Sequence, residues 1–149
     1  MKPIITILGP TASGKTRLAA LLALELGAEI VSADSRQVYR KMDIGTGKDL
    51  SDYQINGIQI PFHLIDIVEP GVEYNVFQYQ QLAHKAIHEI QNKGKETILC
   101  GGSGMYIEAL LKGYKLFPVP ENQLLRTEWA SYSEEQLSTL LAQFKSLHN

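Results

Sequence analysis

One stretch near the start of the chain constrains its fold more than any other. Residues 3–8 are apolar and typical of a strand, and a helical pattern begins at Arg17. The loop between them has the form GxxxxGK[ST], and it consists of Gly9, Pro10, Thr11, Ala12, Ser13, Gly14, Lys15 and Thr16. In this setting the motif predicts backbone N–H groups that surround a phosphate, a lysine charge beside it and a threonine hydroxyl that can bind Mg²⁺. The alternative is an ordinary glycine-containing turn, which has no need for Lys-Thr.

Composition narrows the class of protein further. The chain has 149 residues, 44% of them hydrophobic, which is enough to bury one core. Its formal net charge of −2 gives no overall attraction to nucleic acid, although residues 1–48 carry seven basic and four acidic side chains. The single cysteine excludes an internal disulfide and a cysteine-based zinc site. Neither a signal peptide nor a membrane segment is recognisable, so we expect a cytoplasmic location.

Strand and helix patterns alternate along most of the chain. Strands are predicted at 29–32, 62–67 and 96–100, and helices at 75–93 and 105–111. Asn56-Gly57 predicts a small hairpin over 53–60, and the apolar run 18–24 predicts a helix covered on several sides. The alternation indicates an α/β fold with a doubly wound parallel sheet and flanking helices.

The composition changes after Phe117, which suggests a boundary between residues 1–117 and 118–149. Ser133 and Gln136 have the spacing of a capping box, and an apolar stripe follows at Leu137, Leu140, Leu141, Phe144 and Leu147. Such a stripe needs a partner. It packs back on the chain, dimerises or meets a segment that this chain does not contain, and we favour the last.

Five motifs follow one another in order: GPTASGKT, SADSRQVYR, MDIGTGK, HLIDIVEP and GGSGMYIEALL. Together they resemble the tRNA dimethylallyltransferase family, also called tRNA isopentenyltransferases. The resemblance implies a P-loop-containing nucleoside triphosphate hydrolase-like fold that binds dimethylallyl diphosphate. It also implies Mg²⁺ as cofactor, a monomer, and transfer of the C5 group to N6 of the adenine 3′ to the anticodon of tRNA.

Family members are considerably longer than this chain. The resemblance therefore implies that residues 1–117 are the N-terminal part of the core, that 118–149 begin a helical tRNA-binding insert, and that the chain alone is weakly active or inactive. Ser103 stands where threonine is usual and keeps the hydroxyl, while Gly47 replaces a common alanine and Lys41 a common glycine. None of these changes removes a reactive group.

Three residues are predicted to be catalytic. An exocyclic amine loses its proton as its bond to carbon forms, so a carboxylate at the end of a strand, Asp34, is the candidate general base. Its alternatives are a helix cap or a carboxylate near Mg²⁺. Lys15 would stabilise the departing diphosphate, and Ser103 would bind the diphosphate or the amine, or else cap the helix from Met105.

Other site residues are less firmly assigned. By resemblance, tRNA contacts come from Asp34, Ser35, Arg36, Gln37, Ser103 and Arg126. Asp66 follows an apolar run and either helps to bind Mg²⁺ or caps a turn. The alternative function is a small P-loop kinase or NTPase, which would use the same loop on ATP and Asp66 on Mg²⁺. His84 and His88 lack the glutamate of a zinc helix, since residue 85 is lysine.

Overall fold

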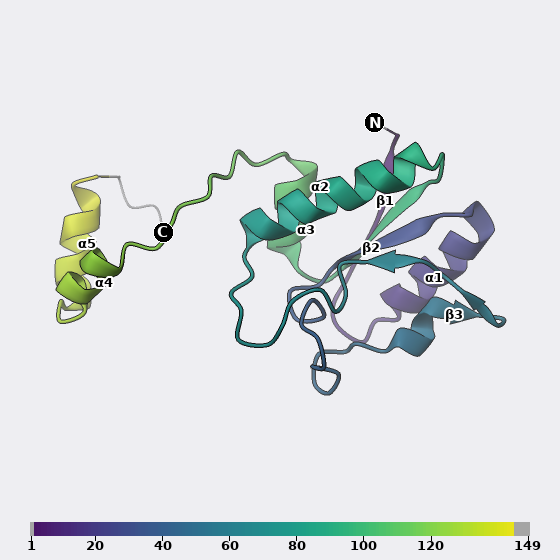
Figure 1. Cartoon of the computed structure of the whole chain (residues 1–149), viewed down its shortest axis with the longest axis horizontal. Coiled ribbons are helices and arrows are strands. Elements are labelled where there is room, and N and C mark those ends of the chain that lie inside the picture. Colours follow the sequence, from purple (N-terminus) through teal and green to yellow (C-terminus); the bar gives the residue numbers. More distant parts are fainter. Residues whose placement is uncertain (1, 145–149) are drawn as a thin grey trace. The chain divides into compact units, whose positions relative to one another are not determined.

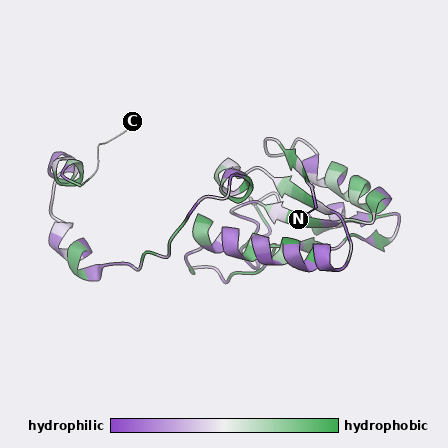
Figure 2. Ribbon diagram, turned by 90° about the horizontal axis from the view of Figure 1, so that it is seen from above, coloured by the Kyte–Doolittle hydropathy of each residue, from purple (hydrophilic) through white to green (hydrophobic). Residues whose placement is uncertain are grey.

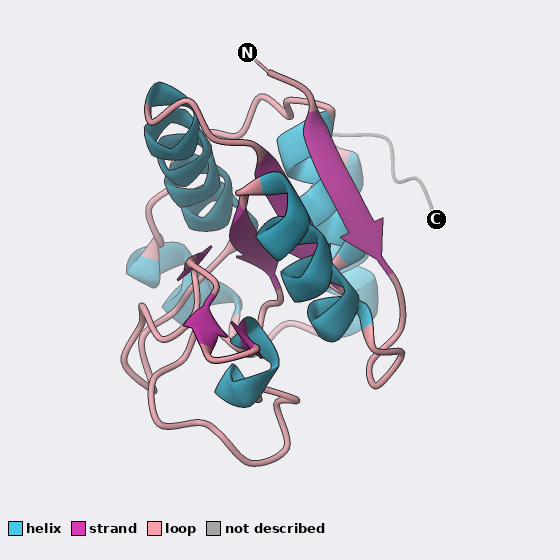
Figure 3. Cartoon of the chain, turned by 90° about the vertical axis from the view of Figure 1, so that its right-hand side faces the viewer, coloured by secondary structure: helices cyan, strands magenta, loops and turns pink. Residues whose placement is uncertain are grey.

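The computed structural model describes residues 2–144, which divide into two compact units, 2–116 and 117–144. Among the described residues of the first unit, four parallel strands form the main sheet in the order β1-β6-β2-β5. The strands are β1 (Ile4–Leu8), β2 (Glu29–Ala33), β5 (Phe62–His63) and β6 (Thr97–Gly101). Figure 3 shows β1 at one edge of this sheet. The predicted parallel α/β fold is confirmed.

The register of the strands brings their carboxyl ends to one edge of the sheet. Leu8 of β1 pairs with Gly101 of β6, and Ala33 of β2 pairs with the same glycine. Both β2 and β6 are buried along their whole length, as expected of inner strands of a parallel sheet. The three strands therefore end at the same level, and the loops that follow them are neighbours.

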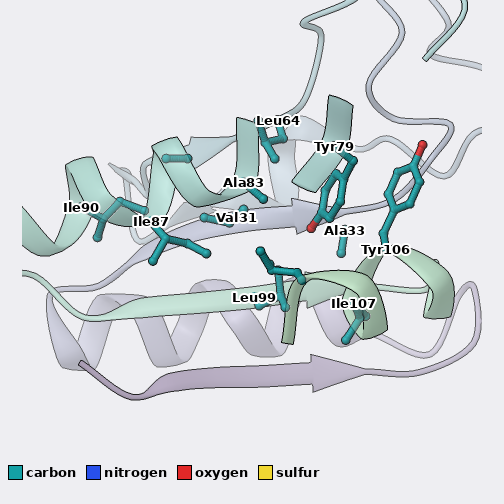
Figure 4. Close-up of a cluster of buried hydrophobic side chains, with 12 residues drawn as sticks. Val31, Ala33, Leu64, Tyr79, Ala83, Ile87, Ile90, Leu99, Tyr106 and Ile107 are labelled. Atoms are coloured by element: carbon teal, nitrogen blue, oxygen red, sulfur yellow. The ribbon is translucent and has the colours of Figure 1, made fainter. Parts of the chain in front are cut away.

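Helices cover both faces of the sheet (Figure 1). Helix α1 (Lys15–Leu26) packs its alanines against Ile30 and Ile98 on one face. Helices α2 (Val76–Asn92) and α3 (Gly104–Leu111) pack on the other, where Val31 and Leu99 meet Ile87 (Figure 4). The outward side of α2 is hydrophilic (Figure 2), as its spacing of apolar residues predicts.

The predicted ends of the helices agree with the structure. Gly27 ends α1 in the left-handed conformation with φ 63°, and its N–H donates to the Ala23 carbonyl. Asn75 and Gln78 form the predicted capping box at the start of α2. The prediction that α1 is covered on several sides is wrong, because Leu18 is 57% exposed and the buried face consists of alanines. A high content of residues that favour helix formation does not predict how many faces of the helix are buried.

The segment after Phe62 differs most from the prediction. A strand over 62–67 is wrong, because β5 ends at His63 and the residues Leu64 and Asp66 have φ of 65° and 55°. In place of a ladder, the N–H groups of Asp66 and Ile67 donate to carbonyls of Gln37 and Val38, at 3.1 and 2.8 Å. These bonds fix the segment beside the turn that follows β2.

The predicted hairpin is confirmed. A short 3₁₀ helix, η1 (Leu50–Tyr53), leads into β3 (Gln54–Ile55), which pairs antiparallel with β4 (Ile58–Gln59). Asn56 and Gly57 both have positive φ, 52° and 80°, as a tight two-residue hairpin turn requires. The ring of Tyr53 is buried and lies 4.5 Å from that of Phe62, which fixes the hairpin on the core.

The second unit contains α4 (Gln123–Trp129) and α5 (Glu134–Ala142). The predicted capping box of Ser133 and Gln136 is present. Most of the predicted apolar stripe is exposed, with Leu141 at 53% and Phe144 at 79%, whereas Leu140 is partly buried and Leu147 lies outside the described residues. Within residues 2–144, no helix is both long enough and apolar enough to cross a bilayer.

Candidate functional site

The loop from Gly9 to Gly14 joins β1 to the first residue of α1, as the motif predicts. Gly14 occupies the N-cap position of α1 with φ 77°, a conformation that favours glycine, and no side chain caps the helix there. Ala12 also has a positive φ, 61°. The first-turn N–H groups of α1 are therefore free of a side-chain acceptor, which is the arrangement found at anion-binding helix ends.

Lys15 lies over the loop. Its Nζ donates to the Pro10 carbonyl at 3.0 Å, and the Ser13 hydroxyl donates to the same carbonyl at 2.8 Å. Gly102 adjoins the lysine, and a Cβ at this glycine would lie 3.3 Å from the Gly9 carbonyl oxygen and 3.9 Å from Nζ. A single weak acceptor holds the ammonium group, so a bound phosphate can replace it with a stronger charge-assisted bond.

A pocket of about 150 Å³ opens beside this loop. The phosphate loop lines it with Lys15 and Thr16, the end of β2 contributes Asp34, and the 3₁₀ helix contributes Asp52. The other lining residues are Thr11, Ala12, Gly14, Gln37, Thr46 and Gly47. Three of the sequence motifs thus converge on one cavity. Asp52 was not predicted, because it belongs to no motif and approaches the loop only through the packing of the hairpin.

The Asp34 carboxylate is held by its own turn. Its Oδ1 accepts a hydrogen bond from the Arg36 N–H at 2.9 Å and from the Gln37 N–H at 3.4 Å. The Gln37 side chain donates to the Gly47 carbonyl at 3.1 Å and so joins the turn to the opposite wall of the pocket. Both backbone bonds use Oδ1, so the second oxygen of Asp34 is not required to hold the turn.

Ser103 joins the ends of two strands. Its Oγ accepts from the Ser35 N–H at 2.9 Å and lies 3.2 Å from the Ser35 hydroxyl, while its own N–H donates to the Ala33 carbonyl at 3.0 Å. Helix α3 begins at Gly104, and the Ser103 side chain does not cap it. The alternative of a side-chain cap is therefore wrong. Ser103 is not among the residues that line the pocket, and its catalytic role stays a prediction.

Comparison with known proteins identifies the family. A family model described as IPP transferase matches residues 37–149, which is more than half of the chain. The chain belongs to the IPP transferase family. It is similar to "tRNA dimethylallyltransferase 1" of Parabacteroides distasonis, with 62% identity over 146 residues, and to "tRNA dimethylallyltransferase 2" of Bacteroides fragilis, with 61%. These alignments cover 98% of this chain and 48% of each relative, so the chain spans about half the length of the curated relatives it matches.

Solved structures agree with the IPP transferase assignment. The full-length tRNA isopentenylpyrophosphate transferase of Bacillus halodurans superimposes with a TM-score of 0.73 at 34% identity, covering 99% of this chain and 51% of that one. A eukaryotic dimethylallyltransferase described as acting on tRNA gives a TM-score of 0.79 at 26% identity, covering 96% and 36%. The P-loop fold predicted from the resemblance is thereby confirmed.

One predicted metal ligand of this IPP transferase domain lies apart from the pocket. Asp66 does not end a strand, and its carboxylate pairs with Lys48, whose side chain is 1% exposed. The same ammonium group pairs with Asp43 at 2.8 Å and donates to the Tyr39 carbonyl at 3.0 Å. Burial alone would lower the pKa of Lys48, but its hydrogen bonds to Asp43 and Asp66 outweigh burial and raise the pKa. Asp66 and Lys48 therefore fix the loop that forms one wall of the pocket.

The remaining predicted residues are distributed as follows. Arg36 is exposed, directly after the Asp34 turn. Arg126 lies on α4 in the second unit, where it pairs with Glu121 at 2.8 Å. His88 bonds to Asn92 on α2, and residues 2–144 contain no cluster of three or more His, Cys, Asp or Glu side chains suited to a metal. A cation at the phosphate loop would therefore depend on oxygens of the ligand as well as of the protein.

Proposed function

We propose that this chain forms the part of a tRNA dimethylallyltransferase that binds dimethylallyl diphosphate, and that its substrate is tRNA, modified at N6 of the adenine 3′ to the anticodon. One observation carries the proposal: Asp34 lines the same pocket as Lys15 and Thr16. A base and a phosphate-binding loop that share a cavity suit a displacement at a carbon attached to diphosphate. The names of the similar proteins agree with this reaction.

The groups in the pocket can stabilise the leaving diphosphate and accept the proton that the reaction releases. The N6 nitrogen forms a bond to the allylic carbon as the bond from that carbon to the diphosphate oxygen breaks. The N–H groups of the loop and the Lys15 ammonium group take the growing charge on the diphosphate. The second carboxylate oxygen of Asp34 accepts the proton that N6 loses. The backbone bonds to Oδ1 orient this oxygen throughout.

Mg²⁺ is the cation that these oxygens suit. The Thr16 hydroxyl and the Asp52 carboxylate line the pocket, and both are hard ligands of the kind that Mg²⁺ uses together with phosphate oxygens and water. When bound, the ion would neutralise part of the diphosphate charge. We assign this role to Asp52 in preference to Asp66, because Asp66 pairs with Lys48 outside the pocket.

The residues proposed to contact tRNA lie around the Asp34 turn and on α4. The N–H groups of Arg36 and Gln37 bond to the Asp34 carboxylate, so both residues would adjoin an adenine whose N6 reaches Asp34. Base access to such a pocket requires that the adenine leave its stack. Ser35 and Ser103 bond to each other at the end of the sheet and would face the same nucleotide, and Arg126 would contact the RNA from the second unit. We further infer that the family-length protein is a monomer in the cytoplasm.

A kinase or NTPase acting on ATP is the alternative, and ligand-dependent stability separates the two. The melting temperature of the first unit is measured with Mg²⁺ and either dimethylallyl diphosphate or ATP. We expect protection by the allylic diphosphate, lost in Lys15→Ala, because a ligand that binds only the native state raises the free energy of unfolding with the logarithm of its concentration relative to its dissociation constant. Lys112→Ala, on an exposed lysine far along the chain from the loop, is the matched control. Protection by ATP alone would contradict the proposal.

A further inference from the structure

A second pocket lies beside the first and lacks the groups that take part in the proposed transfer reaction. Its volume is about 530 Å³, and it is lined by Arg36, Tyr39, Met42, Ile44, Val72 and Glu73. Thr46 lines both pockets, so the loop 42–47 separates them. This loop is well fixed: the Thr46 hydroxyl donates to the Met42 carbonyl at 2.7 Å, and Lys48 binds the Tyr39 carbonyl.

The lining combines exposed apolar side chains with two opposite charges. Ile44 is 98% exposed, Val72 is 53% exposed and Met42 is 43% exposed. Apolar side chains gathered in water at one hollow indicate a binding surface. Arg36 and Glu73, both exposed, add a cation and an anion to the same hollow. A ligand that matches this arrangement is flat and mainly apolar. It carries a hydrogen-bond donor for Glu73 and is joined to a negatively charged group that pairs with Arg36.

We propose that this pocket binds the nucleobase next to the target adenine in the RNA strand; the inference rests on the proposed function. Asp34 lines the first pocket, whereas Arg36, two residues later, lines the second. The adenine that reaches Asp34 thus occupies the mouth of the first pocket, and the adjoining base is directed to the second. Arg36, at the second pocket and two residues after Asp34, pairs with the phosphate that links the two nucleotides.

The chemistry of the lining selects a base over other parts of the substrate. Nucleobases stack on aromatic and apolar side chains, which Tyr39, Met42 and Ile44 supply. A phosphate is disfavoured beside Glu73. The dimethylallyl group is tied to the diphosphate in the first pocket. Glu73 can accept a hydrogen bond from the exocyclic amine of adenine, cytosine or guanine. Uracil has no such amine, and the two carbonyl oxygens beside its N3–H are repelled by the carboxylate, so the three amine-bearing bases are preferred.

The test is an NMR titration of this chain with a pentaribonucleotide that has a central adenosine. The methyl signals of Ile44 and Met42 should shift upfield as a base stacks on them, whereas the methyl signals of Ile58, 52% exposed on the β3–β4 hairpin, should not move. Ile44→Ala should weaken RNA binding by about fivefold or more and leave binding of inorganic diphosphate unchanged. The matched control, Ile58→Ala, should bind RNA as the wild type does.

The outcomes separate this inference from the proposed function. RNA that shifts the amide signals of residues 35–37 but not the Ile44 methyl signals would overturn the second pocket and leave the reaction intact. An oligonucleotide with uracil flanking the adenosine should bind more weakly than one with adenine, and Glu73→Gln should reduce the difference. Equal binding of both would refute the role of Glu73. If neither RNA nor diphosphate perturbs either pocket, both the inference and the proposed function are overturned.

Discussion

Acid sensitivity of the first unit should depend on one buried carboxylate at the start of β2. Glu29 is 2% exposed, and its carboxylate accepts hydrogen bonds from Lys95 at 2.9 Å, from His63 at 2.8 Å and from Lys93 at 3.3 Å. Burial alone would raise the pKa of Glu29, but the bonds from Lys95, His63 and Lys93 outweigh it and lower the pKa to about 2. Glu29→Gln removes this charge and keeps the size of the side chain.

The magnitude follows from the difference between the folded and unfolded states. The pKa falls from 4.5 to about 2, and about 1.4 kcal/mol for each pKa unit gives an upper figure of about 3 kcal/mol. Lys93 and Lys95 are 52% and 41% exposed, so solvent screening reduces this figure. Because the folded-state pKa is lowered, the contribution is complete above about pH 5 and is lost as the pH falls toward 2.

The assay is urea unfolding followed by the NMR methyl signals of Val31 and Leu99, which report on the first unit alone. At pH 7 the wild type should be more stable than Glu29→Gln, and the difference should shrink by up to about 3 kcal/mol between pH 5 and pH 2. Glu25→Gln, at an exposed position on α1, is the matched control and should follow the wild type at every pH. A difference in stability between the wild type and Glu29→Gln that does not change with pH would show that the Glu29 carboxylate does not titrate with a lowered pKa.

Three further substitutions test the packing around the site, each by the free energy of unfolding. Lys48→Met leaves two carboxylates without their buried cation and should cost about 2 to 4 kcal/mol, whereas Lys112→Met, in an exposed pair, should change stability by less than about 1 kcal/mol. Gly101→Ala places a Cβ 2.2 Å from the Ala33 carbonyl oxygen and should cost about 3 kcal/mol or prevent folding; Gly104→Ala, with open space around it, is its control. Asn75→Ala removes the cap of α2 and should cost about 1 kcal/mol. Near-neutral results for Lys48→Met or Gly101→Ala would contradict the described contacts.

Local signals in the sequence were sufficient for the features that depend on neighbouring residues. The phosphate loop, the capping boxes and the Asn56-Gly57 hairpin each follow from a few adjacent residues, and the structure contains all of them. Strand alternation was also sufficient for the parallel fold, because buried inner strands such as β6 are continuous apolar runs.

Features that depend on distant segments could not be predicted. The run after Phe62 is apolar, yet the carbonyls of Gln37 and Val38 bind its N–H groups and end the strand early. Asp52 reaches the pocket through the packing of the hairpin, and Lys48 pairs with Asp66 across 18 positions. No short-range pattern indicates such partners. The exposed leucines of α1 could not be predicted either, because the burial of a helical residue depends on which distant segments pack against the helix.

Asp34 is proposed to take the proton from N6 of the adenine while the neighbouring loop holds the allylic diphosphate. Single-turnover transfer of the dimethylallyl group to tRNA tests this role in a chimaera, in which this chain replaces the matching 146 residues of the Parabacteroides distasonis relative. Asp34→Asn should slow transfer by about 10²- to 10⁴-fold with unchanged affinity for dimethylallyl diphosphate, while Asp49→Asn, outside the pocket, should transfer as the unsubstituted chimaera does. Unimpaired transfer by Asp34→Asn in an active chimaera would show that Asp34 is not the base.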